Sequence, residues 1–195
     1  MTGKNAAGEL RTLLDALFEK EGAEIGKAVE AIVGALKAGR KILVFGNGGS
    51  AAEAQHLAAE IVNKFMVKRR ALPAISLSTD TSALTSIAND MSFEHVFSRQ
   101  IEALGTKGDV ALALTTSGNS ANIIEGLRAA AAGGLTTIVL TGGGGGRLAR
   151  GPAAGSGSVP VDILVDVPSK STPRVQEAHL LLLHVIAEEI DRRVK

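Results

Sequence analysis

The sequence contains no cysteine among its 195 residues. This excludes disulfide bonds, thiol nucleophiles and zinc sites built from thiolates, and a cytoplasmic protein fits such a composition best. An excess of charge is also missing, because 21 basic residues face 20 acidic ones and the formal net charge is +1. We therefore expect neither nucleic acid nor a membrane surface as the main partner, and any anion site must be local.

Long apolar runs are absent too. Glu9, Arg11 and Asp15 occupy the region where a signal peptide would need an apolar stretch, and no segment approaches the roughly 18 uncharged residues of a membrane span. Hydrophobic residues nevertheless make up 45% of the sequence, which is enough for a proper core. We expect a soluble chain with one domain, residues 1–195.

The most informative stretch begins at Lys41. Five mostly β-prone residues, 41–45, lead into Gly46-Asn47-Gly48-Gly49-Ser50 and then into an alanine-rich segment, 51–60. This order predicts a buried strand, a tight glycine turn and a helix. Glycines let the backbone approach a ligand closely, Ser50 can cap the helix, and the helix N-terminus favours an anion. The stretch therefore predicts a cradle for a phosphate or another anion.

Two chemically active side chains follow on the predicted helix. His56 and Glu60 are four residues apart, so they lie one turn apart on nearly the same face. Such a pair could share a metal ion or flank a substrate, although an isolated pair of this kind is more often a solvated surface pair. Its position two turns after the glycine cradle favours a functional site.

Two other phosphate motifs lack essential partners. Gly46-x-Gly48-x-x-Ala51 also fits the dinucleotide fingerprint, but the acidic residue expected about 20 positions later is missing, and Asp80 comes too late. The five glycines of 142–146 lack the Lys-Ser/Thr partner of a P-loop, so we interpret them as a flexible turn. A nicotinamide cofactor is therefore not expected.

Strand and helix patterns alternate along the rest of the chain. Further strands are predicted at 72–77, 109–114, 136–141 and 162–167, helices at 82–88, 93–104, about 120–132 and 173–193, and a loop at 151–160. This alternation predicts an α/β fold with a doubly wound, five-stranded parallel sheet, for which we expect the common flavodoxin-like order 2-1-3-4-5. In that order the ligand crevice lies beyond the carboxyl ends of the first and third strands.

The turn after the third strand is rich in hydroxyl groups. Thr115, Thr116, Ser117 and Ser120 surround Gly118 at a predicted helix start, and no cation accompanies them. Hydroxyl and backbone donors in this position suit a phosphate monoester, and we favour phosphate binding over helix capping alone.

The N-terminal region, about 8–38, has apolar residues at helical spacing. Gly22 and Gly26 predict a break or bend, which would give two helices before the sheet begins. These helices could pack against a second subunit or, equally, against the chain's own sheet.

Six segments occur together in an order that is specific as a set. They are Gly46-Asn47-Gly48-Gly49-Ser50, Ala54-Gln55-His56, Ala88-Asn89-Asp90, Phe97-Ser98-Arg99-Gln100, Thr116-Ser117-Gly118-Asn119-Ser120 and Arg174-Val175-Gln176-Glu177-Ala178-His179. With them the chain resembles the phosphoheptose isomerases, a branch of the sugar isomerase (SIS) domain proteins, over nearly its whole length. The resemblance implies a single SIS domain in a homotetramer that converts sedoheptulose 7-phosphate to D-glycero-D-manno-heptose 7-phosphate, the first step toward the heptose of bacterial surface polysaccharide.

The resemblance also implies a set of site residues. Substrate contacts would come from Asn47, Gly48, Ser50, Lys64, Asn89, Asp90, Thr115, Thr116, Ser117, Ser120 and Gln176. One Zn2+ ion per site would be held by His56, Glu60, Gln176 and His184. Of these, Glu60 and His184 would also form the acid/base pair.

The chemistry asked of these residues is coherent. Moving a carbonyl from C2 to C1 requires removal of a proton next to the carbonyl, an enediol, and return of a proton to the neighbouring carbon. A carboxylate with a pKa raised by burial can be the base, and an imidazole can exchange protons with the oxygens. Zinc could polarise the carbonyl or simply hold the catalytic groups in place, and the sequence leaves both roles open.

The chain departs from the family pattern in a few places. Lys64 stands where arginine is common, Thr115 replaces a common serine, and the region 142–160 is longer and richer in glycine than usual. These departures concern the substrate more than the reaction type. His184, in an apolar helical segment, could also be a core histidine bonded to a carbonyl.

Two other functions are compatible with the pattern. One is a non-catalytic SIS protein that binds the bacterial replication initiator or senses a sugar phosphate, and the other is an isomerase of a different ketose phosphate. The presence of both Glu60 and His184 argues for an enzyme.

Helical geometry adds an expectation about assembly. Gln176 and His184 are eight residues apart, so a straight helix separates them by about 12 Å and about 80°. One ion could hardly bind both. If both are ligands, the simplest arrangement takes them from equivalent helices of neighbouring subunits, and the active site is then shared. The alternatives are a broken helix or a site that uses only one of them.

Overall fold

The computed structural model describes residues 3–150 and 159–194. Its elements, in chain order, are α1 (Gly3–Lys37), β1 (Ile42–Gly46), α2 (Gly49–Val62), β2 (Ala74–Ser76), α3 (Thr81–Asp90), η1 (Phe93–His95), α4 (Ser98–Leu104), β3 (Val110–Leu114), α5 (Ala121–Ala132), β4 (Thr136–Gly142), η2 (Leu148–Arg150), β5 (Ile163–Val167) and α6 (Thr172–Arg193). The predicted alternation of strands and helices is confirmed. Most of the loop predicted at 151–160 lies outside the described residues.

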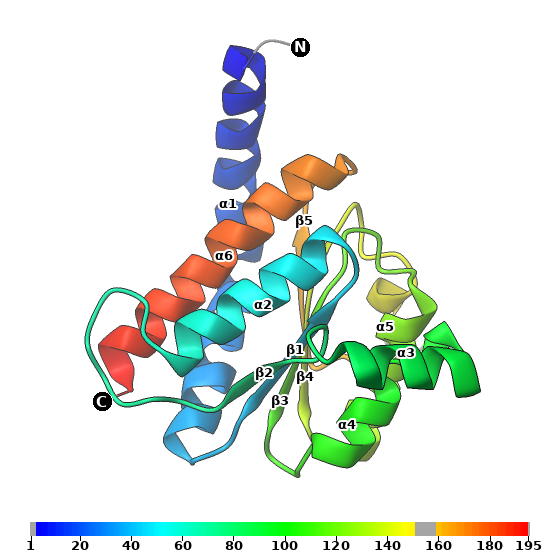
Figure 1. Ribbon diagram of the computed structural model, residues 1–195. Coiled ribbons are helices and arrows are strands. Elements are labelled where there is room, and N and C mark those ends of the chain that lie inside the picture. The colour runs from blue at the N-terminus through cyan, green and yellow to red at the C-terminus, as the bar shows by residue number, and fades with distance from the viewer. Residues whose placement is uncertain (1–2, 151–158, 195) are drawn as a thin grey trace.

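The five strands form one parallel sheet in the order β2-β1-β3-β4-β5 (Figure 1). The predicted order is therefore confirmed. Strand β2 is shorter than the predicted 72–77 and lies at the edge of the sheet. Pro73 has no N–H to donate to a ladder, and its carbonyl only accepts a hydrogen bond from Ile42.

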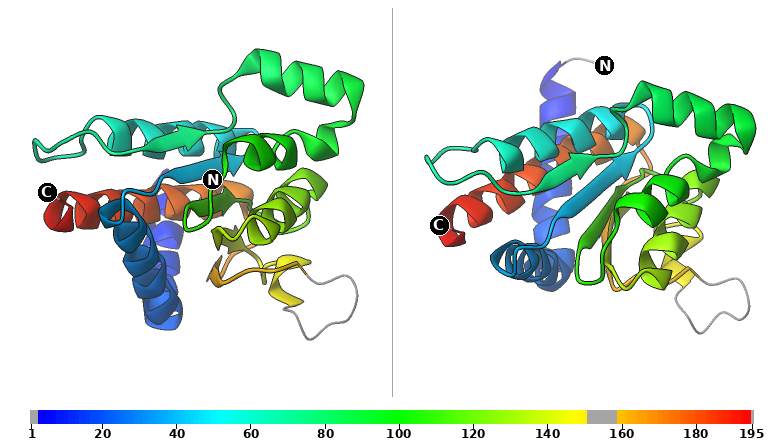
Figure 2. Two further views of the ribbon diagram at one scale, coloured as in Figure 1. Left: turned by 90° about the horizontal axis from the view of Figure 1, so that it is seen from below. Right: turned by 60° about the horizontal axis from the view of Figure 1, so that its bottom comes forward.

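Helices cover both faces of the sheet (Figure 2). Alternate residues of β1 point to opposite faces, so Ile42 and Val44 join a core with α1, α2 and α6, whereas Leu43 and Phe45 join a core with α4 and α5. Both faces are thus buried, as a parallel sheet requires. Strand β1 lies inside the sheet and ends at Gly46. The loop that follows it therefore lies at the carboxyl ends of the strands, called here the carboxyl edge, beside the end of β3.

The prediction of two N-terminal helices is wrong, because α1 is continuous from Gly3 to Lys37. Gly22 and Gly26 each weaken a helix by about 1 kcal/mol relative to alanine. Fully burying one large apolar side chain, such as Leu17 or Ile32, contributes about 1.5–3 kcal/mol. Several such side chains line α1 on both sides of the glycines, so packing outweighs the local preference for a break. The N-terminal end of the helix projects from the body (Figure 1).

None of the helices within residues 3–150 and 159–194 is long and apolar enough to cross a membrane.

His179 is the histidine that the core encloses. Its ring on α6 is fully buried, and Nε2 donates a hydrogen bond to the carbonyl oxygen of Thr141 at 3.1 Å. Burial lowers the pKa of His179 from 6.5 to about 4, although the bond to the carbonyl acts in the opposite direction. The ring is therefore neutral in the folded protein at neutral pH, and its proton is on Nε2.

This burial makes stability depend on pH. The unfolded chain protonates His179 more readily than the folded chain, so the contribution of the neutral ring is complete above pH 6.5 and is lost as the pH falls toward 4. His179→Gln keeps an N–H for Thr141 and does not titrate. We expect the stability advantage of the parent protein over this variant to shrink by about 2 kcal/mol between about pH 7.5 and about pH 5.

Urea unfolding of the parent protein and of the variant at both pH values measures this change. Subtracting the free energy of unfolding of the variant from that of the parent removes the contributions of other titrating groups. A difference that does not change with pH would contradict the assignment of a neutral, buried His179.

Candidate active site

The loop between β1 and α2 is built on close backbone contacts. A Cβ at Gly46 would lie 2.8 Å from the Cβ of Ser50 and 2.9 Å from the carbonyl oxygen of Leu114. Gly48 has a φ of 56°, in the left-handed region that favours glycine. These two glycines let the chain reverse tightly and begin α2 at the carboxyl edge of the sheet.

The prediction that Ser50 caps this helix is wrong. The N-cap residue is Gly48, which has no side chain to offer, and Ser50 is already inside the first turn, where it is buried. The glycine turn is tighter than the sequence pattern indicates, so the helix begins one residue before Ser50. The Ser50 hydroxyl instead bonds the carboxyl group of Glu53 and faces the crevice.

The second turn follows β3 and leads into α5. Thr115 is buried, and its hydroxyl accepts a hydrogen bond from the backbone N–H of Gly118. Ser120 is the N-cap residue of α5, but its side chain makes no capping bond. Its hydroxyl is therefore not used by the helix. This observation favours ligand binding over capping, the two uses that the sequence leaves open.

A pair of amides joins the two turns. The Asn47 Nδ2 atom donates to Oδ1 of Asn122, and the Asn122 Nδ2 atom donates back to Oδ1 of Asn47, both at 2.9 Å. Asn122 lies in the first turn of α5 and is buried. This residue was not among those proposed from the sequence. An amide on the inward face of a predicted helix, just after the hydroxyl-rich turn, is a signal that could have identified it.

Between the turns lies a small polar hollow of about 170 Å³. It is lined by Asn47, Ser50, Leu114, Thr115, Thr116, Ser117, Ser120, Thr172 and Gln176. Its volume corresponds to about five or six water molecules. Within the part of the chain that the structure describes, no lysine or arginine lines it, so an anion here would be held by hydroxyl, amide and backbone groups. Thr172, at the start of α6, is a lining residue that sequence analysis did not propose.

A second cluster lies further along α2. The Nε2 atoms of His56 and His184 face each other at 2.9 Å, and Oε1 of Glu60 approaches His56 Nε2 at 3.9 Å. The Phe65 ring stacks on the His184 ring, with centroids 5.3 Å apart. His184 is only partly buried and bonds another histidine, so the interpretation as a core histidine applies to His179 and not to His184. All these residues belong to one chain.

The side chains of this cluster are of types that commonly bind zinc. Two imidazole nitrogens and a carboxylate oxygen are common zinc ligands. Within residues 3–150 and 159–194, however, no group of three or more such side chains is already arranged to hold a metal ion. His56, Glu60 and His184 would have to close around the ion by small side-chain movements.

Gln176 does not join this cluster in the chain described. Its amide packs so closely on Gly49 that a Cβ there would lie 2.4 Å from Gln176 Nε2. Gly49 precedes His56 by seven residues, about 10 Å along α2. Gln176 and His184 are therefore separated along α6, as helical geometry predicts. Glu60 and His184 both lie close to His56 of the same chain, without a partner subunit.

Three other proposed residues lie away from the hollow. Asn89 and Asp90 are exposed at the end of α3, where the Asn89 amide donates to the Asp90 carboxylate at 2.8 Å. Lys64 is exposed in the segment after α2. The structure brings none of them to the two turns.

Glu53 is a further residue that sequence analysis missed. It lies on α2 between Ser50 and His56, and burial raises the pKa of its carboxyl group to about 7, although the hydrogen bond with Ser50 lowers it. Its Oε2 atom is buried and has no hydrogen-bond partner among the described residues. A carboxyl group with this pKa is partly protonated at neutral pH.

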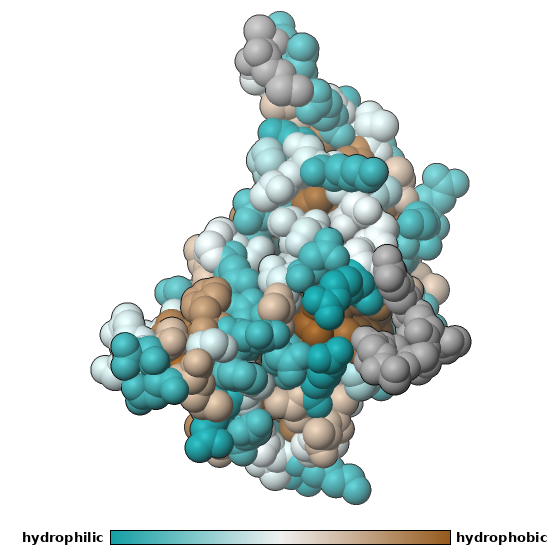
Figure 3. Space-filling model, turned by 90° about the vertical axis from the view of Figure 1, so that its right-hand side faces the viewer, coloured by the Kyte–Doolittle hydropathy of each residue, from teal (hydrophilic) through white to brown (hydrophobic). Residues whose placement is uncertain are grey.

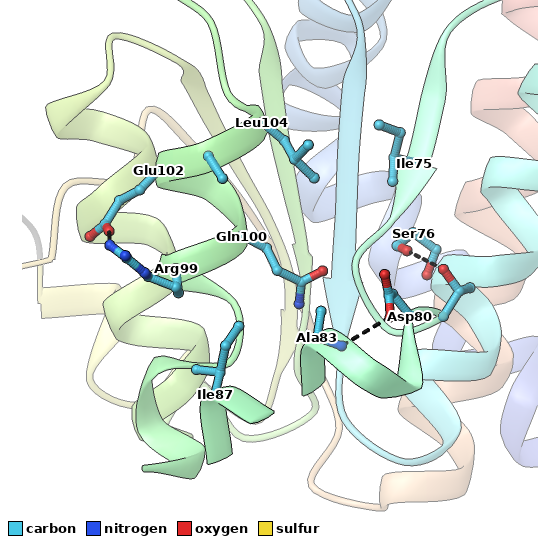
Figure 4. Close-up of a pocket in the computed structure, with 11 residues that line it drawn as sticks. Ile75, Ser76, Asp80, Ala83, Ile87, Arg99, Gln100, Glu102 and Leu104 are labelled. Carbon is cyan, nitrogen blue, oxygen red and sulfur yellow. Dashed lines mark hydrogen bonds and ion pairs between the residues drawn. The ribbon is translucent and has the colours of Figure 1, made fainter. Parts of the chain in front are cut away.

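A larger hollow, of about 700 Å³, lies beside the edge strand β2 and between α3 and α4 (Figure 4). Its charged groups are occupied locally, because Arg99 pairs with Glu102 and Asp80 accepts a hydrogen bond from the N–H of Ala83. Arg99 and Gln100, from one of the six segments, line it, but none of the site residues proposed from the sequence does. The smaller hollow at the carboxyl edge is the better candidate active site, since the polar turns converge there.

Comparisons with known proteins identify the family of the chain. The SIS domain family matches residues 7–142. A phosphoheptose isomerase of Shewanella sediminis is 49% identical over 168 residues, which cover 86% of this chain and 82% of that protein. One of Geobacter sulfurreducens is 45% identical over 184 residues, covering 94% and 93%.

A solved structure of a similar protein leads to the same family. The phosphoheptose isomerase of Neisseria gonorrhoeae superposes with a TM-score of 0.86 at 42% sequence identity, covering 97% of this chain and 96% of its own. Sequence, fold and the two glycine- and hydroxyl-rich turns thus agree over nearly the whole length, and the chain belongs to the phosphoheptose isomerases of the SIS domain family.

Proposed function

We propose that this aldose-ketose isomerase converts sedoheptulose 7-phosphate to D-glycero-D-manno-heptose 7-phosphate through an enediol. The observation that carries the proposal is that one helix, α2, presents Ser50 to the polar hollow and His56 and Glu60 to the second cluster. Ser50 and His56 are six residues apart, about 9 Å along the helix. An open-chain seven-carbon sugar phosphate can span that distance.

The hollow would bind the phosphate group. Thr116, Ser117 and Ser120 offer hydroxyl donors, Ser50 would turn its hydroxyl from Glu53 to the phosphate, and the N-terminus of α5 adds backbone donors and a favourable dipole. Asn47, already oriented by Asn122, would bind the sugar hydroxyls. The phosphate would thereby fix one end of the substrate and direct the carbonyl end along α2.

The second cluster would perform the proton transfers. In this proposal Glu60 removes the proton next to the carbonyl and returns it to the neighbouring carbon, while His184 exchanges protons with the oxygens. His56, Glu60 and His184 would hold zinc, which when bound supplies a Lewis acid for the substrate oxygens. The proposed substrate contacts of Lys64, Asn89 and Asp90 would require movement or a neighbouring subunit.

The proposal includes a homotetramer whose active sites are shared between subunits. It also places the protein in the cytoplasm, where it would serve heptose synthesis for surface polysaccharide. The projecting end of α1 and the exposed side chains of Met91, Phe93 and Leu104 support assembly. The α3–α4 side of the molecule, turned toward the viewer in Figure 3, shows brown hydrophobic areas among teal polar ones.

The non-catalytic alternatives are not favoured, since the similar proteins reported above are isomerases.

Turnover tests the reaction itself. The protein, with zinc supplied, should convert sedoheptulose 7-phosphate to the aldoheptose phosphate and, in heavy water, incorporate deuterium at C1 or C2. Glu60→Gln keeps the shape of the side chain but removes the base, so we expect no measurable turnover. A variant with near-normal kcat would remove Glu60 from this role, and absence of turnover by the parent protein on any five- to seven-carbon ketose phosphate would refute the enzyme function.

The phosphate site makes a separate prediction. Ser120→Ala removes a hydroxyl that α5 does not use, and loss of one hydrogen bond to a charged group is worth about 1.5–3 kcal/mol, or about 10- to 100-fold in KM. Steady-state kinetics should show this rise with kcat largely retained. Ser86→Ala, in exposed α3, is the control and should leave KM unchanged. Equal KM values for all three proteins would place the phosphate elsewhere.

Zinc binding can be tested without measuring activity. His184→Asn removes one nitrogen of the cluster, so the purified variant should retain much less zinc by elemental analysis than the parent protein. His95→Asn changes a histidine on η1, outside the cluster, and should keep the parent stoichiometry. Equal zinc content in the parent and both variants would exclude His184 as a ligand.

A further inference from the structure

A buried ion pair lies next to the second cluster. Arg69 Nε donates to Oδ1 of Asp191 at 2.8 Å, and the two side chains are only 4% and 2% exposed. The other carboxylate oxygen accepts hydrogen bonds from the backbone N–H groups of Met66 and Val67, at 2.7 and 2.8 Å. Burial alone would raise the pKa of Asp191, but these bonds hold it below its usual value, so the carboxylate stays charged.

The remaining nitrogens of Arg69 hold the end of α2. Nη2 donates to the carbonyl oxygen of Glu60 at 2.8 Å, and Nη1 donates to that of Ile61 at 2.9 Å. These carbonyls belong to the last turn of the helix, where intrahelical partners run out and where the helix dipole favours a cation. The guanidinium group therefore fixes the backbone of Glu60 itself.

Asp191 provides the link to α6. It follows His184 by seven residues, which places the two side chains about two turns apart on nearly the same face. The segment that Asp191 holds, around Met66 and Val67, also carries Phe65, whose ring stacks on His184. The ion pair thus connects the residue proposed as base, the ring beside the proposed acid, and the helix that carries that acid.

The Glu60 side chain needs such support. Its distance of 3.9 Å from His56 Nε2 is too long for a hydrogen bond. Among the described residues no hydrogen bond fixes this carboxylate, so the backbone of the last turn of α2 sets the point from which the side chain reaches His56. A shift of that turn would move Glu60 relative to His184 without touching the phosphate hollow at the other end of the helix.

We propose that Arg69 and Asp191 are positioning residues for the isomerisation, which hold Glu60 and His184 in the relative placement that proton transfer requires. The inference rests on the function proposed above. It predicts a loss in kcat with little change in KM, because Ser50 and Ser120 are remote from the pair.

The chain offers a matched control for a purely structural role. Asp109 also accepts two backbone hydrogen bonds, from Lys41 and Thr106, and also pairs with a cation, the Lys41 ammonium group. This pair lies at the start of β1 and β3, at the opposite edge of the sheet from the candidate active site. Asp109→Asn therefore removes a similar charge and disturbs a similar network, one whose hydrogen bonds and ion pairs reach neither Glu60 nor His184 among the described residues.

The experiment compares Asp191→Asn and Asp109→Asn with the parent protein in steady-state turnover of sedoheptulose 7-phosphate and in urea unfolding. Asp191→Asn should lower kcat by about 10- to 100-fold, the usual effect of removing a supporting partner, with KM within about twofold of the parent value. Asp109→Asn should lose stability but keep the parent kcat.

Should Asp191→Asn fail to fold, Arg69→Lys takes its place, because it keeps the buried charge but loses the forked bonds to the α2 carbonyls. It should show the same selective loss of kcat. A kcat equal to that of the parent, or equal losses in the Asp109 and Asp191 variants, would overturn the inference. Absence of turnover by the parent protein would instead refute the proposed function, so the two failures are distinguishable.

Discussion

Helix α2 packs along α6 on one face of the sheet, and this contact supplies partners to both halves of the site. Near the start of α2, Gly49 contacts the amide of Gln176, whereas His56 faces His184 further along. The two helices begin after β1 and β5, strands that are not neighbours in the sheet. Their packing therefore joins residues more than a hundred positions apart, and it places the phosphate-binding half and the proton-transfer half of the site along one pair of helices.

The glycine turn sets where that contact begins. Gly46 approaches Ser50 and Leu114 so closely that no side chain fits, which brings the start of α2 directly over the end of β3. Asn47 then reaches Asn122, and the two turns form one polar surface. Among the described residues no lysine or arginine lines the small hollow, and Lys170 lines only the adjoining one, so neutral donors would hold an anion in the small hollow, and such donors are directional. Their placement, rather than the net charge of the molecule, would determine selectivity.

Much of this could be predicted from the sequence. The strands were located from apolar runs and turn residues, and their order in the sheet was taken as the common one for this fold class. Ser50, Thr115, Thr116, Ser117 and Ser120 are found together in the hollow because the carboxyl ends of parallel strands meet at one end of the sheet. Asn122, Thr172 and Glu53 were missed because their roles depend on burial and long-range contacts, for which a single sequence carries little signal. Continuity of α1 was missed for a related reason, since the apolar contacts that outweigh its glycines are made with distant elements.

Gly22 and Gly26 of α1 have a consequence for engineering. A Cβ at Gly22 or Gly26 would meet no atom of the described chain within 4 Å, so nothing inside this subunit requires the missing side chains. Each glycine adds conformational freedom to the unfolded chain, which the helix must give up on folding, at about 0.4–1 kcal/mol per position relative to alanine. An isolated subunit is therefore less stable than it would be with alanine at these two positions. Both positions are available for raising the thermal stability of the protein without altering its core or its site.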